Sequence, residues 1–118
     1  MTADQETIAK FLMEFKDLTS TGRNFYFIER PEKNSEFINF GLNINNIKRE
    51  LLGLSVEDYC SGPEKDRDRP GDVWMFGKEI NGHEVYIKLK IFYIGSEKNA
   101  KCISFHEAES PIEYPSRK

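Results

Sequence analysis

The sequence contains no long hydrophobic run and only two cysteines. No apolar stretch approaches the roughly 20 residues that a membrane-spanning helix requires, and no basic region precedes an apolar one at its start. We therefore expect a cytoplasmic protein with no membrane association. Cys60 and Cys102 lie far apart, without the Cys and His spacing of a zinc site. We expect both to be free thiols, and we expect no metal and no cofactor.

Positive charge is also scarce, because 17 Lys and Arg face 20 Asp and Glu, which gives a net charge of −3. This balance argues against indiscriminate nucleic-acid binding, since affinity for phosphate comes mainly from lysine and arginine. The charge is nevertheless uneven. Residues 65–101 carry eight Lys and Arg against six Asp and Glu, whereas the rest of the chain carries nine against fourteen. A local basic patch on an acidic protein is therefore compatible with the sequence.

Hydrophobic residues are sufficient for a folded domain. The chain has 118 residues, of which 38% are hydrophobic and 13% aromatic, so burial can offset the entropy that is lost on ordering. This length is enough for one core and too short for two ordinary domains. We therefore predict a single domain over residues 1–118.

Helical periodicity begins near the start of the chain. Thr2 and Gln5 have the spacing of a capping box, and Gly22 ends the pattern that follows. The apolar residues at helical spacing between them are Ile8, Phe11, Leu12, Phe15 and Leu18. We predict an amphipathic helix here. The aromatic and β-branched segment Phe25–Ile28 is then typical of a short strand, which Pro31 would end.

A second helix is predicted from a cap at Asn45 to Gly53, and Ser55 with Asp58 indicates a shorter helix after it. The residues of the second helix expected to face the core are Ile47, Leu51 and Leu52. Residues 61–71 contain no hydrophobic side chain and are bracketed by Gly and Pro. We predict that this segment is a solvated loop.

The pattern changes to strands after residue 72. Asn81-Gly82 is a strong hairpin signal. The predicted antiparallel strands are Val73–Ile80, His83–Ile94 and Ala100–His106, with a five-residue loop before the last and an extended tail or covering loop after it. Helices followed by antiparallel strands predict an α+β domain, with N-terminal helices packed on one face of a small antiparallel sheet.

The turn at Asn81-Gly82 predicts which side chains share the other face of this sheet. It places Met75 opposite Lys88 and Gly77 opposite Tyr86. The five-residue loop would then pair apolar residues of the last two strands on the buried face. On the polar face, that register pairs Ser104 with Lys90 and His106 with Lys88.

A tyrosine, two lysines and a histidine on one surface have the chemistry for metal-independent cleavage of RNA, whose ribose supplies its own 2′-OH nucleophile. Histidine titrates near neutral pH, so His106 suits a general acid or base. Lys88 and Lys90 would stabilise charge on the phosphate, while Tyr86 would stack on a base, donate a proton or hold the phosphate. The basic residues of the 61–71 loop that would add phosphate contacts are Lys65, Arg67 and Arg69.

Each of these residues also has a structural interpretation. Lys88 and Lys90 alternate with apolar residues as on any solvated strand, and Tyr86 is typical of a half-buried packing position. His106 near a strand end is compatible with an ordinary surface histidine. From the residues alone, both interpretations stay open.

The order of several short segments resembles the MqsR (motility quorum-sensing regulator) toxins, which belong to the RelE-like type II toxins. The segments are Gly41-Leu42, Gly53-Leu54-Ser55-Val56-Glu57-Asp58-Tyr59, Val73-Trp74, Glu84-Val85-Tyr86-Ile87-Lys88 and Ile103-Ser104-Phe105. They span about two thirds of the chain, and it is their order and spacing that is specific. The resemblance implies a RelE-like endoribonuclease (mRNA interferase) that cleaves mRNA, free or ribosome-bound, and is silenced by a cognate antitoxin.

The resemblance places the catalytic tyrosine of the family on Tyr86. The family's lysine after the short helix falls on Ser61, its glutamine after the tryptophan falls on Met75, and its lysine after the Ser-Phe pair falls on His106. We expect catalytic roles for Tyr86, Lys88 and His106. The residues expected to bind substrate are Lys65, Arg67, Arg69, Lys90, Ser104 and Met75.

These departures leave alternatives. A thioether at Met75 lacks the hydrogen bonds of an amide, which favours a catalytically weak or inactive module of the same fold that binds RNA or protein. A small-ligand α+β domain is a third possibility, and it would need an apolar pocket that the sequence does not indicate.

Overall fold

A computed structural model describes residues 2–27 and 41–117. Helix α1 (Gln5–Ser20) begins after Asp4, whose carboxylate accepts a hydrogen bond from the Thr7 N–H at 2.8 Å. The capping role predicted for Thr2 is therefore wrong, because Asp4 satisfies the free N–H group of the first turn. All five apolar residues predicted at helical spacing contact the core.

Helix α3 (Ile44–Leu52) begins two residues earlier than predicted, after Asn43. The side chain of Asn43 accepts from the Asn46 N–H at 2.9 Å, and the Asn46 side chain accepts from the Asn43 N–H at 3.0 Å. Of the three residues predicted to face the core, Leu52 is exposed and the other two are buried. A 3₁₀ helix, η2 (Val56–Asp58), follows where a short helix was predicted.

The sheet has five strands in the order β1-β5-β4-β3-β2. The strands are β1 (Phe25–Phe27), β2 (Tyr59–Lys65), β3 (Asp72–Ile80), β4 (His83–Ile94) and β5 (Glu97–Glu107). β1 pairs with β5 in parallel, and the other neighbouring pairs are antiparallel. The predicted end of the first strand at Ile28 and the role of Pro31 lie outside the described residues.

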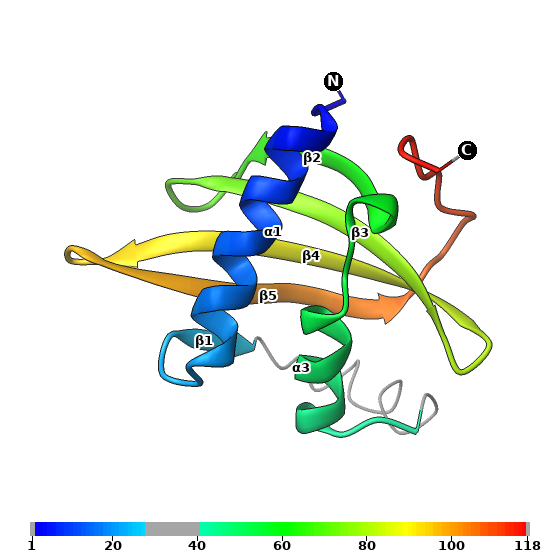
Figure 1. The fold of residues 1–118 in the computed structure, drawn as a ribbon, viewed down its shortest axis with the longest axis horizontal. Coiled ribbons are helices and arrows are strands. Elements are labelled where there is room, and N and C mark those ends of the chain that lie inside the picture. The colour runs from blue at the N-terminus through cyan, green and yellow to red at the C-terminus, as the bar shows by residue number, and fades with distance from the viewer. Residues whose placement is uncertain (1, 28–40, 118) are drawn as a thin grey trace.

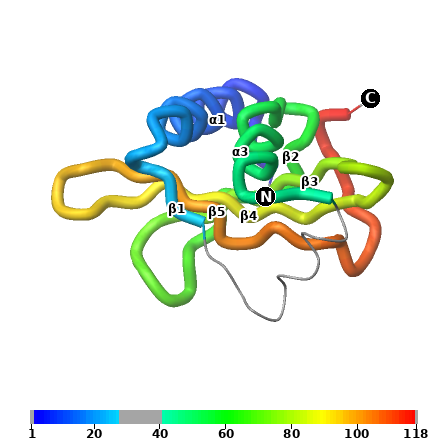
Figure 2. Tube along the Cα trace, turned by 90° about the horizontal axis from the view of Figure 1, so that it is seen from below, coloured from blue at the N-terminus to red at the C-terminus, as the bar shows by residue number. Residues whose placement is uncertain are grey.

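Helices α1 and α3 cover the same face of this sheet (Figures 1 and 2). The core lies between the two layers, where the Phe11 ring of α1 stacks on Trp74 of β3 with ring centroids 4.5 Å apart. The predicted α+β class, with helices on one face of the sheet, is confirmed, but the sheet is mostly and not entirely antiparallel, because β1 is parallel to β5. Within the two described ranges, no helix is long and apolar enough to cross a membrane.

The predicted pairing of β3 with β4 is confirmed. Asn81 and Gly82 both have positive φ, at 51° and 84°, as the tight hairpin turn requires. Met75 pairs with Lys88 and Gly77 with Tyr86. The turn therefore fixes which side chains of β4 face away from the helices.

The predicted antiparallel pairing of β4 with β5 is confirmed, but its predicted register is wrong. A two-residue turn replaces the expected five-residue loop, so Ile94 pairs with Glu97, and β5 is offset from the predicted register. A β-bulge adds one extra residue in β5 opposite Lys88 and Leu89. Consequently His106 pairs with Tyr86 instead of Lys88, and Ser104 pairs with Lys88 instead of Lys90.

The predicted solvated loop over residues 61–71 is partly wrong, because β2 extends to Lys65 and pairs with β3 through two register shifts. The sequence pattern did not indicate this edge strand, because only Tyr59 and Cys60 among its residues are apolar. The turn that follows is closed by the Asp66 N–H, which donates to the Gly71 carbonyl at 3.0 Å. In Figure 2 this green turn lies on the side of the sheet opposite the helices.

Candidate functional site

The sheet face opposite the helices, which we call the open face, carries the polar side chains of β4 and β5. In β4, Val85, Ile87 and Leu89 are buried in the core. Tyr86 and Lys88 alternate with them and therefore lie on the open face, where both are half-buried. This placement confirms the predicted division of β4 into an apolar and a polar face.

Tyr86 and His106 form a ring pair on the open face. Their ring centroids are 5.4 Å apart with an interplanar angle of 33°. The Nδ1 atom of His106 lies 2.9 Å from the Glu107 carbonyl oxygen. Because a carbonyl only accepts, we assign the proton of a neutral His106 ring to Nδ1. Its Nε2 atom then has a free lone pair and can accept a proton.

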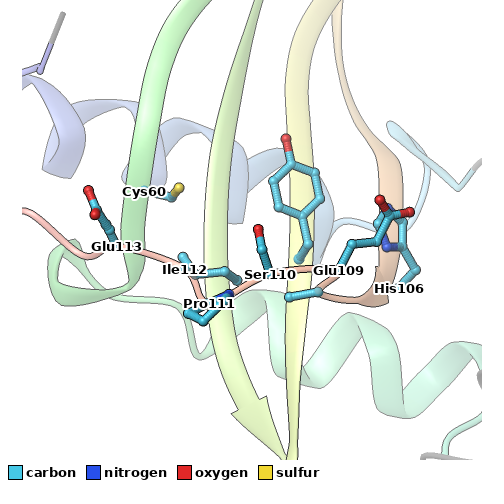
Figure 3. Close-up of a pocket in the computed structure, with 9 residues that line it drawn as sticks. Cys60, His106, Glu109, Ser110, Pro111, Ile112 and Glu113 are labelled. Atoms are coloured by element: carbon cyan, nitrogen blue, oxygen red, sulfur yellow. The ribbon is translucent and has the colours of Figure 1, made fainter.

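The ring pair opens into a cleft of about 550 Å³, which we call the tail cleft. Its lining residues are Cys60, Tyr86, His106, Ala108, Glu109, Ser110, Pro111, Ile112 and Glu113. Figure 3 shows the segment from Glu109 to Glu113 crossing the strands between His106 and Cys60. The C-terminal segment after β5 therefore forms one wall of the cleft, as a covering loop.

Glu84 of β4 fastens this wall to the sheet. One of its carboxylate oxygens accepts from the Ile112 N–H at 3.1 Å, and the other accepts from the Tyr114 hydroxyl at 3.1 Å. Burial, together with the hydrogen bond to Glu84, raises the pKa of Tyr114 to about 12. Tyr114 therefore stays protonated and donates at every physiological pH. The same segment is also attached to the 3₁₀ helix, because the Arg117 guanidinium donates a hydrogen bond from Nη2 to Asp58 Oδ1 at 3.1 Å.

The tail cleft keeps its phenol and thiol neutral. Burial raises the pKa of Tyr86, and the nearby Cys60 and Glu64 add to this effect. Burial likewise raises the pKa of the Cys60 thiol above its usual value. At neutral pH Tyr86 is therefore a hydrogen-bond donor, and Cys60 is a poor nucleophile because the thiolate is the reactive form.

Lys88 faces a second depression, of about 540 Å³, which we call the basic groove. Its lining residues are Glu64, Lys65, Asp66, Arg67, Asp68, Arg69, Val73, Lys88, Lys101 and Ile103. The predicted phosphate contacts of the 65–69 segment are thus gathered beside Lys88. Lys101 was not predicted to belong to this group.

Lys90 does not face a substrate, contrary to our prediction. It is buried, with 2% of its surface exposed, and its Nζ atom donates to Asp66 Oδ2 at 2.6 Å. This hydrogen bond, followed by that from the Asp68 N–H, lowers the pKa of Asp66 to about 2. Asp66 begins the turn that carries Arg67 and Arg69. The ion pair therefore holds this turn, which forms one side of the basic groove, against the sheet.

The turn should therefore depend on Asp66. In Asp66→Asn, the buried Lys90 ammonium loses its counterion, and we expect Tm to fall by roughly 5–10 °C. The pKa of Asp66 is lower in the folded protein than its ordinary value of 3.8. The ion pair therefore stabilises the fold fully at pH values above 3.8, and this stabilisation is lost as the pH falls through about 2. The difference in Tm between the wild type and Asp66→Asn, measured by thermal denaturation at several pH values, should therefore shrink as the pH falls from 3.8 towards 2.

Asp68→Asn is the matched control, because Asp68 is exposed in the same turn and the substitution makes the same change in charge. Its Tm should equal that of the wild type. Equal Tm values for Asp66→Asn and Asp68→Asn at neutral pH would contradict the anchoring role of Asp66.

Met75 also lies where it cannot contact a substrate as predicted, because 3% of its surface is exposed. Ser104, opposite Lys88, is half-buried and remains on the open face. The structure thus brings Tyr86 and His106 together and places Lys88 in the adjoining groove. The residues that the sequence did not reveal are Cys60, Lys101, Glu109, Ser110, Ile112 and Glu113.

The fold and the open face define a class: an α+β domain whose mostly antiparallel sheet has helices on one side and two adjoining depressions on the other. Among the described residues, no group of three or more His, Cys, Asp or Glu is arranged to hold a metal ion. Comparisons of the chain with family models, curated proteins and solved structures give no match.

Proposed function

We propose that this protein is a metal-independent endoribonuclease that cleaves mRNA, a toxin of the MqsR and RelE-like kind held in check by a cognate antitoxin. The observation that carries the proposal is the Tyr86–His106 ring pair, which opens into a cleft directly beside a groove containing Lys88. The order of the family-like segments in the sequence supports it. The open face then offers a proton acceptor, a neutral proton donor and a groove that can bind phosphate.

The two depressions suit two parts of a nucleotide. Lys88 lies two residues from Tyr86 along β4, which is roughly 7 Å at the rise of an extended strand. A nucleobase stacked in the tail cleft would therefore have its phosphate within reach of the basic groove. Aromatic stacking beside a positive groove is how proteins bind single-stranded nucleic acid without reading long sequences.

Each side chain then has a role in strand cleavage. The Nε2 atom of His106 takes the proton of the ribose 2′-OH, and the 2′-oxygen attacks phosphorus while the bond from phosphorus to the 5′-oxygen breaks. Tyr86 donates its proton to the leaving oxygen, which is far more basic than a phenolate, so the transfer is favourable despite the raised pKa of Tyr86. The Lys88 ammonium stabilises the negative charge on the phosphate.

A binding module without catalysis is the second candidate. The wall of the tail cleft carries Glu109 and Glu113, and carboxylates repel a phosphate that enters from that side. The burial of Met75 removes a further predicted contact. Such a module would bind RNA with a strong dependence on salt and leave it intact.

The dependence on the 2′-OH separates the two candidates. We expect the wild-type protein, in the presence of EDTA, to cut a single-stranded RNA and to leave a 2′,3′-cyclic phosphate. The matched substrate in which every 2′-OH is methylated should bind and stay uncut. Electrophoresis of end-labelled substrates measures both outcomes, and the assay should be run on free mRNA and on ribosome-bound mRNA.

Cleavage of the methylated substrate would contradict attack by the 2′-oxygen. Salt-dependent binding without cleavage of any RNA, free or on ribosomes, would leave the binding module as the better proposal. A wild-type protein that neither binds nor cuts RNA would overturn both.

A further inference from the structure

A second aromatic pair lies on the open face, at the edge where β1 joins the sheet. Tyr26 of β1 is exposed over 43% of its surface. Its ring meets the ring of Phe92 in β4, with centroids 5.7 Å apart and an interplanar angle of 63°. The two rings thus meet edge to face, and Phe92 fixes the orientation of the Tyr26 ring. Part of the Tyr26 ring remains exposed to solvent.

Lys101 connects this pair to the basic groove. It is the β5 partner of Tyr26 in the parallel register, and its Nζ atom lies 5.3 Å from the centroid of the Phe92 ring. Lys101 also lines the basic groove with Lys88 and the Arg67–Arg69 turn. A cation held over an aromatic ring therefore stands at the junction between the exposed tyrosine and the groove.

The two aromatic pairs flank the groove along β4. Phe92 lies six positions beyond Tyr86 along β4, which is roughly 20 Å of extended strand. A nucleotide stacked in the tail cleft cannot reach that far, so several nucleotides of one strand would lie between the two positions. The intervening surface contains the cations of the groove, which matches the negative charge of a backbone that crosses it.

We infer that Tyr26, Phe92 and Lys101 form a second base-stacking subsite for single-stranded RNA, separate from the tail cleft. A base stacks on the exposed ring of Tyr26, Phe92 holds that ring in place, and Lys101 binds the adjacent phosphate. Because every base has a flat aromatic face, the subsite accepts any base. This inference rests on the proposed function, since it takes the open face to be the surface that binds RNA.

The test compares the RNA affinities of Tyr26→Ala and Tyr93→Ala by fluorescence anisotropy. Two labelled probes are used: a single-stranded RNA long enough to span both aromatic pairs, and a dinucleotide that cannot span them. Tyr93 is exposed over 60% of its surface. It pairs with Lys98, whose Nζ atom binds Glu14 of α1 at 2.8 Å, so this control tyrosine lies on the helix side. Tyr26→Ala should weaken binding of the long RNA at least roughly fivefold and leave the dinucleotide unaffected, whereas Tyr93→Ala should change neither.

Tyr26→Phe serves as the conservative variant, because it keeps the ring and should restore the wild-type affinity. If Tyr26→Ala folds normally and binds the long RNA as tightly as Tyr93→Ala, the subsite is overturned while the proposed function stands. If the wild type binds no RNA, both fall. Selective loss of the long RNA with rescue by Tyr26→Phe supports the subsite.

Discussion

Replacing His106 with alanine is expected to slow RNA cleavage by roughly 100- to 10,000-fold, the usual contribution of a general base. The substitution removes the Nε2 acceptor and leaves Tyr86 and the groove cations in place, so RNA should bind with little change in affinity. The loss should therefore lie in kcat, with KM nearly constant. Single-turnover cleavage and anisotropy, measured on the same RNA, give the two quantities separately.

His83→Ala is the matched control, because His83 is the other of the two histidines. It lies beside the Asn81-Gly82 turn, where its Nδ1 atom is 3.0 Å from Glu107 Oε2. We expect its cleavage rate to equal that of the wild type. Equal rates for wild type, His83→Ala and His106→Ala would exclude His106 as the base, even if the protein cleaves RNA.

Replacing Gly77 with alanine is expected to displace the wall of the tail cleft. A Cβ atom at this position would lie 2.6 Å from both Ile112 Cδ1 and the Tyr114 hydroxyl, so these two side chains, which pack the segment after β5 against the sheet, must shift. We expect the free energy of unfolding to fall by about 1–3 kcal/mol, as for other overpacked sites. Chemical denaturation measures this loss, and limited proteolysis should cut the displaced segment faster.

Gly53→Ala is the control for loss of a glycine. A Cβ atom at this position would have one neighbour closer than 3.4 Å, the Nζ atom of Lys78 at 3.3 Å, and this is the end of a flexible side chain. Stability should therefore change little. Combining Gly77→Ala with Ile112→Ala should be less destabilising than the two separate losses together, because the second substitution makes room for the first. Additive losses would show that Gly77 does not act through Ile112.

The pairing of β3 with β4 could be predicted because a two-residue turn with positive φ permits only one register. The next connection has a two-residue signal of its own, Gly95-Ser96, with Gly95 at a φ of 62°, but the apolar pairs also fit the five-residue loop that we predicted. Leu89 meets an apolar partner in either register, Phe105 as predicted or Cys102 as found. Apolar alternation therefore could not distinguish them, and the extra residue of the bulge has no sequence signature.

The site could be predicted as far as it depends on a single strand. Alternation along β4 placed Tyr86 and Lys88 on the open face, but it also placed Lys90 there as a free cation. The ion pair with Asp66 depends on how the 66–71 turn folds back on the sheet, which a segment without apolar residues does not reveal. The tail cleft depends on the packing of Ile112 and Tyr114 over Gly77, a contact between segments with no shared periodicity.

The parallel pairing of β1 with β5 has a consequence for synthesis of the protein. Residues 25–27 must wait for residues 100–102 before they gain their only sheet partner among the described strands. Such long-range pairing is slow to form, and β5 also supplies His106. On the ribosome, the nascent chain would therefore lack the Tyr86–His106 pair until β5 has emerged. The proposed nuclease would therefore be inert toward nearby mRNA until that point of its translation.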